Sequence, residues 1–152
     1  MAYDFDEKVK LFFEAIGKSA KMVLATSLND IVSARTMSVI IHNGGFYFQT
    51  DIFLRKYNQI IQNENVALCV DNIQIEGICK ELGAPKDHKD FCEHFKKAFP
   101  GSFQAYSMLE NERVFEVVPS FIQRWIYVDK VPHIETFDFK TRTYQKEAYI
   151  GK

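Results

Sequence analysis

The two cations Arg55 and Lys56 are the residues whose position most suggests chemistry, because they fall in the opening turn of a predicted helix over residues 52–63. This helix directly follows a predicted strand over residues 45–50, and we expect Thr50 and Asp51 to cap it. The positive end of the backbone dipole disfavours cations there by roughly 0.3–1 kcal/mol each, whereas the free N–H groups of a helix N-terminus bind phosphate. The pattern indicates either a site for a phosphate monoester or two solvated side chains whose small cost is tolerated.

A third cation, Arg35, lies within residues 31–41. This segment is predicted to be one strand of a hairpin, because it is rich in β-branched side chains and is followed by the turn signal Asn43-Gly44. Side chains alternate along a strand, so Arg35 shares a face with the apolar residues Ile31, Met37, Val39 and Ile41. A guanidinium in an apolar row needs an anion, either an internal Asp or Glu or the phosphate of a ligand. The hairpin places this strand beside the next one, so we expect Arg35 to converge with Thr50 and the Arg55-Lys56 pair.

The composition is that of one globular domain spanning residues 1–152, since 47% of the residues are hydrophobic and 14% are aromatic. A formal net charge of -1, from 19 basic and 20 acidic residues, argues against a nucleic-acid-binding protein. The three cysteines, Cys69, Cys79 and Cys92, lack CxxC spacing and predict buried thiols in a reducing compartment rather than disulfides. An acidic start and the lack of a long apolar run predict a soluble, cytoplasmic protein without a signal peptide or membrane span.

Helical and strand periods alternate along the chain without a linker or a repeat. We predict an N-terminal helix over residues 4–17, the helix over residues 52–63, and a helix that Pro85 opens and Pro100-Gly101 ends. The predicted strands cover residues 21–26, 31–41, 45–50, 65–70, 73–82, 113–118 and 121–128, the last two separated by Pro119-Ser120. Strands joined mainly by hairpins indicate a mainly β (α+β) protein with an antiparallel barrel, because a parallel sheet needs a crossover between its strands.

The order and spacing of these residues resemble the flavin mononucleotide (FMN) site of the pyridoxamine 5'-phosphate oxidase-like split-barrel family. The likeness rests on Arg35-Thr36-Met37-Ser38, followed further along by Thr50-Asp51-Ile52-Phe53-Leu54-Arg55-Lys56 and then by Asn58, Gln59 and Ile60. A hairpin over residues 67–77, which ends in Glu76-Gly77, is similar to the central Glu-Gly strand of the family. The resemblance covers residues 5–130 and implies an antiparallel split β-barrel of the FMN-binding type.

In that family a strand Arg and a Thr, with an Arg-Lys pair opening the following helix, hold the flavin phosphate. The resemblance implies that phosphate or ribityl oxygens contact Arg35, Thr50, Arg55 and Lys56, and that Thr36, Met37, Ser38 and Gln49 complete the cofactor site, the last three lining the flavin. It also implies a homodimer with the flavin at the subunit interface. Leu54 stands where better-known members have a Ser, so one hydroxyl to the phosphate is missing.

The activity implied by the resemblance is that of an FMN-dependent oxidoreductase, which transfers hydride or electrons between a reduced nicotinamide or similar donor and a small acceptor. No segment after Val128 resembles the Trp and Arg substrate segment of pyridoxal-phosphate-forming members, so we expect a flavin reductase-like relative instead. Two alternatives stay open: a non-enzymatic flavin or haem carrier or sensor on the same barrel, and a deazaflavin-dependent reductase. The sequence identifies no catalytic residue, and a flavin performs the redox chemistry itself.

The histidines give no strong signal for a metal. His88 and Cys92 lie four residues apart on one predicted helix, but Cys92 falls in the apolar stripe of that helix and no further ligands accompany the pair. We therefore expect no metal site. His42 is interpreted as an exposed hairpin residue, with an axial haem ligand as the alternative in a haem-binding relative.

Overall fold

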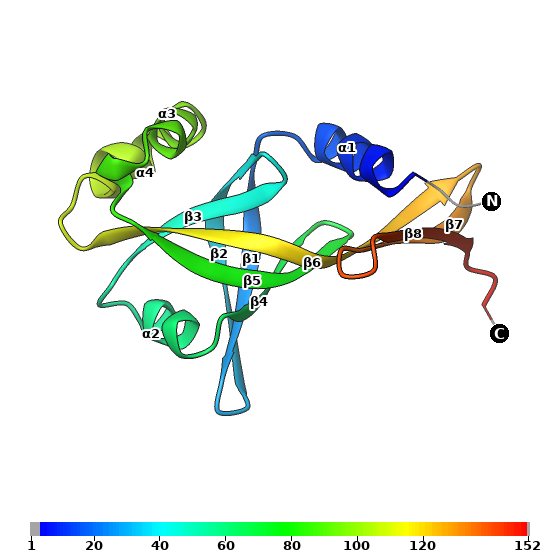
Figure 1. The fold of residues 1–152 in the computed structure, drawn as a ribbon, viewed down its shortest axis with the longest axis horizontal. Helices are drawn as coiled ribbons and strands as arrows, with labels where there is room; N and C mark the ends of the chain where they lie inside the picture. Colours follow the sequence, from blue (N-terminus) through cyan, green and yellow to red (C-terminus); the bar gives the residue numbers. More distant parts are fainter. Residues whose placement is uncertain (1–3, 152) are drawn as a thin grey trace.

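Six strands close into an antiparallel barrel in the computed structural model, which describes residues 4–151 (Figure 1). The strands of this part of the chain are β1 (Ser19–Leu28), β2 (Ile31–His42), β3 (Gly45–Asp51), β4 (Asn65–Val70), β5 (Ile73–Gly83), β6 (Glu112–Val128), β7 (Val131–Asp138) and β8 (Thr143–Ala148). Their order in the sheet is β3-β2-β1-β4-β5-β6-β7-β8, and an additional pairing of β3 with β6 closes the barrel. The predicted split-barrel fold class, mainly β with flanking helices, is confirmed.

Tight turns rich in Asn, Asp and Gly connect neighbouring strands, as the sequence predicts. Asn43 has a φ of 48° and Gly44 a φ of 73° between β2 and β3, and Asp71 has a φ of 51° between β4 and β5. Positive φ matches the twist of a two-residue hairpin, and these residue types adopt it at low cost. The turns therefore fix the order of adjacent strands locally.

Strand β6 is a single strand of 17 residues, so the prediction of two strands separated by Pro119-Ser120 is wrong. Pro119 lies opposite Gly77 at a register shift, where Ser120 forms a bulge in β6. A bulge interrupts the ladder of hydrogen bonds, so the missing N–H of proline is tolerated there. Gly77 is needed at this point because a Cβ atom would lie 2.6 Å from the carbonyl oxygen of Val118.

The connection between β5 and β6 contains several short helical pieces rather than the one predicted helix. They are η1 (Pro85–Asp87), α3 (Lys89–Ala98), α4 (Pro100–Ser102) and η2 (Phe103–Ser107). Pro85 opens a 3-10 turn, and Pro100 begins the next helix instead of only ending α3. Proline fits the first turn of a helix because its missing N–H has no partner there in any case.

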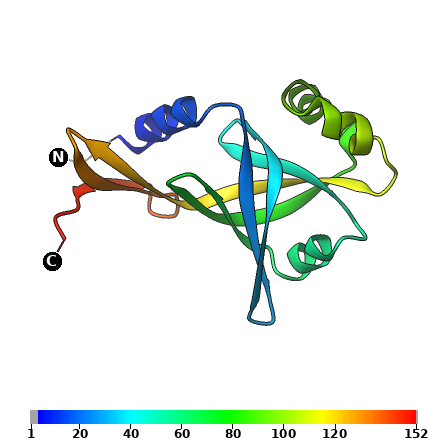
Figure 2. The same cartoon turned by 180° about the vertical axis from the view of Figure 1, so that it is seen from behind.

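The C-terminal part of β6 leaves the barrel and carries β7 and β8, which no sequence pattern predicted. This extension lies beside helix α1 (Phe5–Ile16) at one end of the molecule, seen from both sides in Figures 1 and 2. Phe12 of α1 packs against Phe137 of β7, with ring centroids 5.2 Å apart. The extension is thereby part of the same hydrophobic core as the barrel.

Two apolar clusters hold the fold together. The larger one fills the barrel and reaches the extension, and its most buried side chains include Leu24, Phe46, Phe48, Ile75 and Phe115. The smaller one joins α3 to the outside of the barrel through Ile40, Phe91, Phe95 and Val114. Phe91 and Phe95 stack along α3, with centroids 5.1 Å apart and an interplanar angle of 21°. Helix α3 is thus anchored on the outer surface of the sheet.

The three cysteines differ in exposure, so the expectation of three buried thiols is partly wrong. Cys79 is buried, whereas Cys69 is exposed and Cys92 is half-buried, and all three are free thiols. Burial raises the pKa of the Cys79 thiol to about 12. None of the helices formed by residues 4–151 is long and apolar enough to cross a membrane.

Candidate functional site

A cavity of about 580 Å³ lies at the place where β2 and β3 separate. The two strands pair only from Ile40–His42 to Gly45–Tyr47. Beyond that point β2 continues alongside β1, and β3 pairs with β6 instead. The predicted hairpin between these strands is therefore confirmed, but the two strands separate beyond Tyr47 because each has a longer partner elsewhere.

Six of the eight residues predicted for the cofactor site line this cavity: Thr36, Met37, Ser38, Gln49, Thr50 and Lys56. The other lining side chains come from the segment before α2, from the α3–η2 region and from the start of β6, and sequence reasoning did not assign them to the site as lining residues. They are Asp51, Phe53, Leu54, Phe95, Ser102, Tyr106, Leu109 and Glu112. Arg35 and Arg55 are not among the lining residues.

Thr50 has an unsatisfied hydroxyl group at the edge of this cavity. Its Oγ1 atom is the one buried side-chain polar atom of residues 4–151 that has no hydrogen-bond partner, and Thr50 itself is only 3% exposed. Leaving a buried hydroxyl without a partner costs about 1–3 kcal/mol. The neighbouring Gln49 is satisfied, since its Oε1 accepts a hydrogen bond of 2.7 Å from Ser107. Thr50 therefore offers a free donor and acceptor to a ligand.

Helix α2 (Arg55–Gln62) begins with the two predicted cations, but its cap differs from the prediction. The N-cap residue is Leu54, whose side chain makes no capping hydrogen bond. Asp51 instead accepts a hydrogen bond of 2.8 Å from the backbone N–H of Phe53 and so shapes the turn before the helix. The helix starts three residues later than predicted, and its first turn contains no acidic residue.

The side chain of Arg35 points to the barrel face of β2, opposite to Thr36 and Ser38. Its Nη1 atom donates to the carbonyl oxygen of Leu24 at 3.2 Å and to Oγ1 of Thr26 at 2.9 Å. Its Nη2 atom donates to Oε1 of Gln59 at 3.0 Å. All these acceptors are uncharged, and Arg35 forms no ion pair with a carboxylate of the described residues. The internal salt bridge considered from the sequence is therefore absent here.

The three cations are close enough to repel one another. Burial lowers the pKa of Arg35, and the positive charge of Arg55 lowers it further. Burial also lowers the pKa of Lys56, with a second contribution from Arg35 and an opposing one from Glu112. The side chains of Arg55 and Lys56 make no hydrogen bond or ion pair with any other residue between 4 and 151. The end of α2 is consequently a positive region that an anion would stabilise.

Glu112 is a lining residue that the sequence did not reveal. It is 5% exposed and lies directly opposite Asp51 in the pairing of β3 with β6. Burial and the charge of Asp51 raise the pKa of Glu112 to about 7, although Lys56 works in the opposite direction. To predict Glu112 as a site residue, one would need to know how β3 and β6 pair. These strands are far apart in the sequence, so no local sequence pattern indicates their register.

The other candidate residues have ordinary partners. Nε2 of His88 forms a hydrogen bond of 2.8 Å with the carbonyl oxygen of Leu82, and the Cys92 thiol donates to the carbonyl oxygen of Pro85 at 3.0 Å. His42 is half-buried against another ring rather than freely exposed. Residues 4–151 contain no group of three or more His, Cys, Asp or Glu side chains that could hold a metal ion.

Comparison with known proteins shows that this chain is similar in fold to several solved structures. The sequence matches no protein-family model and no curated protein. A solved structure of a pyridoxamine 5'-phosphate oxidase-related, FMN-binding protein from Nostoc punctiforme has a TM-score of 0.60 at 12% identity, over 96% of this chain and 95% of that one. PhzG from Burkholderia lata, in complex with tetrahydrophenazine-1-carboxylic acid, has a TM-score of 0.65 at 12% identity, over 98% and 96% of the two chains.

A third similar structure is HutZ, the haem storage protein from Vibrio cholerae, with a TM-score of 0.58 at 12% identity, over 77% of this chain and 91% of that one. The resemblance stated from the sequence is thus confirmed as the fold of the FMN-binding split barrels. Proteins of this fold hold different molecules, so the fold alone does not fix the cofactor or the activity of this chain.

Proposed function

We propose that the chain binds FMN in the cavity between β2 and β3, with the flavin phosphate at the N-terminus of α2. The observation that carries this proposal is the unsatisfied Oγ1 of Thr50 in a cavity that Lys56 also lines. Lys56, Arg55 and Arg35 form no ion pair with a carboxylate of residues 4–151. A phosphate accepts hydrogen bonds and carries negative charge, so it would satisfy both. The cavity volume of about 580 Å³ is within the usual range of roughly 300–1,000 Å³ for small-molecule sites.

The residues would hold the cofactor in two ways. Lys56 and Thr50 line the cavity and would contact the phosphate or ribityl oxygens directly, with Arg55 at the exposed edge. Arg35 is fixed by Thr26 and Gln59 and would act mainly through its charge unless the ligand reaches its remaining N–H groups. Met37, Ser38 and Gln49 would line the flavin, and Phe53 and Tyr106 would cover it from the other side.

The activity proposed for the FMN-bound protein is transfer of hydride or electrons between a reduced nicotinamide or similar donor and a small acceptor. When bound, the flavin supplies the redox chemistry, and the chain orients it and excludes water. Phe53 and Leu54 are exposed by 79% and 47% at the rim of the cavity, which leaves room for an acceptor or a second subunit. Glu112 is a carboxyl group beside the cavity that can hold a proton near neutral pH.

We also propose a homodimer with the flavin near the subunit interface. The β1–β2 hairpin projects from the barrel in both views, and Ile31 and Val32 near its tip are exposed by 60% and 71% (Figures 1 and 2). Exposed apolar side chains of this kind favour burial against another chain. Light scattering should give the mass of a dimer for the unaltered protein, and replacing Val32 with Lys should shift this mass towards that of the monomer. A monomeric mass for the unaltered protein would contradict the dimer. A cytoplasmic location stays a prediction.

The absorption spectrum of the freshly purified protein, followed by titration with FMN, tests the proposal. We expect flavin absorbance, or quenching of FMN fluorescence that saturates at one FMN per chain. Colourless protein that leaves FMN fluorescence unchanged would refute it. A haem Soret band would instead favour the carrier or sensor alternative, for which the similarity in fold to a haem storage protein is the specific observation. Steady consumption of a reduced nicotinamide by the FMN-bound protein would separate an enzyme from a carrier.

A further inference from the structure

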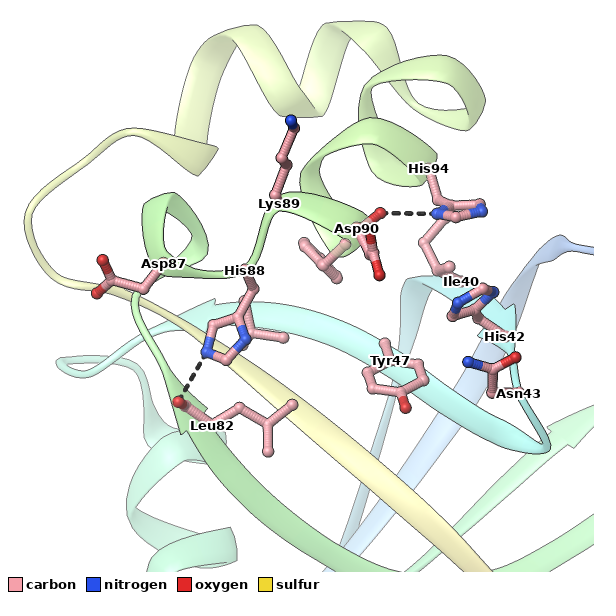
Figure 3. Close-up of a pocket in the computed structure, with 12 residues that line it drawn as sticks. Ile40, His42, Asn43, Tyr47, Leu82, Asp87, His88, Lys89, Asp90 and His94 are labelled. Carbon is pink, nitrogen blue, oxygen red and sulfur yellow. Dashed lines mark hydrogen bonds between the residues drawn. The ribbon is translucent and has the colours of Figure 1, made fainter.

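A second cavity, of about 430 Å³, lies between α3 and the outer surface of the barrel (Figure 3). It shares no lining residue with the first one. Its apolar lining includes Ile40, Phe91 and Val114, which are exposed by 1%, 6% and 0%. A concave site with an apolar floor and a few polar groups is the usual form of a small-molecule site.

Two histidines of this cavity have their protonated nitrogens fixed by backbone carbonyl groups. Nε2 of His88 lies 2.8 Å from the carbonyl oxygen of Leu82, and Nδ1 of His94 lies 2.7 Å from the carbonyl oxygen of Asp90. A carbonyl oxygen can only accept, so each of these nitrogens carries the hydrogen. In the neutral imidazoles the other nitrogens, Nδ1 of His88 and Nε2 of His94, are therefore acceptors.

Two further polar side chains of the lining, Tyr47 and Asp90, also present hydrogen-bond acceptors, whereas the amide of Asn43 can both donate and accept. The Tyr47 hydroxyl donates to a Glu116 carboxylate oxygen at 2.7 Å, and burial together with this carboxylate raises the pKa of Tyr47 to about 12. The hydroxyl thus keeps its proton at neutral pH and uses it in the bond to Glu116, so toward a ligand it can act only as an acceptor. Asp90 lies between His88 and His94 and, as a carboxylate, is an acceptor only (Figure 3).

The cation of the cavity wall, Lys89, does not offset this pattern. Figure 3 shows the ammonium group of Lys89 directed away from the imidazoles, and Asp87 at the far margin. His42 lies against His94, with ring centroids 4.6 Å apart, and adds a flat aromatic surface. An anion would be repelled by the carboxylate of Asp90 here, whereas a metal ion would lack the further ligands that it needs.

We propose that the cavity between α3 and the barrel binds a small planar aromatic cation with N–H donors, such as an amidine or a protonated aromatic amine. The apolar floor and the rings of Tyr47 and His42 would contact the aromatic body. The N–H groups would donate to Asp90, His88 and His94. This site does not depend on FMN, so its success or failure is separate from that of the first cavity.

Benzamidine is a suitable probe, and benzoate is its control because it has the same ring but an anionic, acceptor-only group. Binding is measured by two-dimensional NMR of the histidine side chains during titration of the full chain. We expect benzamidine to shift the His88 and His94 ring signals saturably, and benzoate to leave them unchanged. Benzoate binding as tightly as benzamidine, or no saturable shift with benzamidine, would overturn the proposal.

Two matched substitutions locate the charge. Asp90→Asn keeps the shape but removes the carboxylate charge, so benzamidine affinity should fall by roughly tenfold or more, since a charge-assisted contact is lost. Asp71→Asn lies in the turn between β4 and β5, a conformation that Asn tolerates, and should leave the affinity unchanged. Equal affinity in Asp90→Asn and the unaltered protein would remove Asp90 from the site and with it the preference for a cation.

Discussion

Replacing Lys56 with Ala tests most directly whether the positive region at the start of α2 holds a phosphate. Lys56 lines the cavity and its side chain makes no hydrogen bond or ion pair within 4 Å to residues 4–151, so its ammonium group is available to a ligand. A charge-assisted hydrogen bond contributes about 1.5–3 kcal/mol, which corresponds to an FMN affinity lowered roughly ten- to 150-fold. Titration followed by flavin fluorescence measures this change.

The stability of the FMN-free protein separates loss of a contact from damage to the fold. Burial and the charge of Arg35 both act against the Lys56 ammonium group, as its lowered pKa indicates. The free energy of unfolding without FMN should therefore be unchanged or slightly higher after Lys56→Ala. Lys97→Ala, which removes an exposed cation from the last turn of α3, is the matched control and should leave the FMN affinity unchanged. An unchanged dissociation constant for FMN in Lys56→Ala would refute the proposed role of the cation.

Three further predictions concern the buried acid Glu112, the closely packed Gly77 and the unsatisfied hydroxyl of Thr50. The raised pKa of Glu112 means that the folded state binds more protons than the unfolded state between about pH 4.5 and 7. The free energy of unfolding should therefore fall by roughly 2–3 kcal/mol as the pH rises through this range. Urea unfolding at several pH values should show this decrease in the unaltered protein but not in Glu112→Gln. Gly77→Ala should lower the free energy of unfolding by about 1–3 kcal/mol because of its contact with Val118, whereas Gly101→Ala, with nothing within 4 Å, should be near neutral in the same assay. Thr50→Val should weaken FMN binding about five- to tenfold without destabilising the FMN-free protein; lost stability with unchanged affinity would contradict the proposed contact.

The sequence predicted most of the barrel because its strands are joined by local turns. Asn43-Gly44 and Asp71 mark two hairpins through their tolerance of positive φ, and strand β4 has the bounds that were predicted for it. The fold class therefore followed from signals that act over a few residues. The errors occurred where a local rule met a tertiary effect: Pro119 does not end a strand because it lies opposite Gly77 at a bulge.

The sequence indicated some of the residues that line the cavity, but it did not indicate the geometry of the cavity. The cations at the start of α2 carry a dipole penalty that local reasoning can detect, and Lys56 does line the cavity. The separation of β2 from β3 and the placement of Glu112 depend on pairings with β1 and β6, and these involve residues far apart in the chain. The C-terminal strands were missed for the same reason, since Phe137 and Tyr144 become part of the core only through contacts with distant elements.

The stacked rings of Phe91 and Phe95 have a consequence for communication across the molecule. Phe91 belongs to the wall of one cavity and Phe95 to the wall of the other, and the two rings are in direct contact. Closely packed interiors transmit a displacement instead of absorbing it, so a molecule that pushes on one ring shifts the next. Thermodynamic linkage makes such an influence mutual: if a ligand in one cavity changes the affinity of the other cavity for its ligand, the second ligand changes the affinity for the first by the same factor.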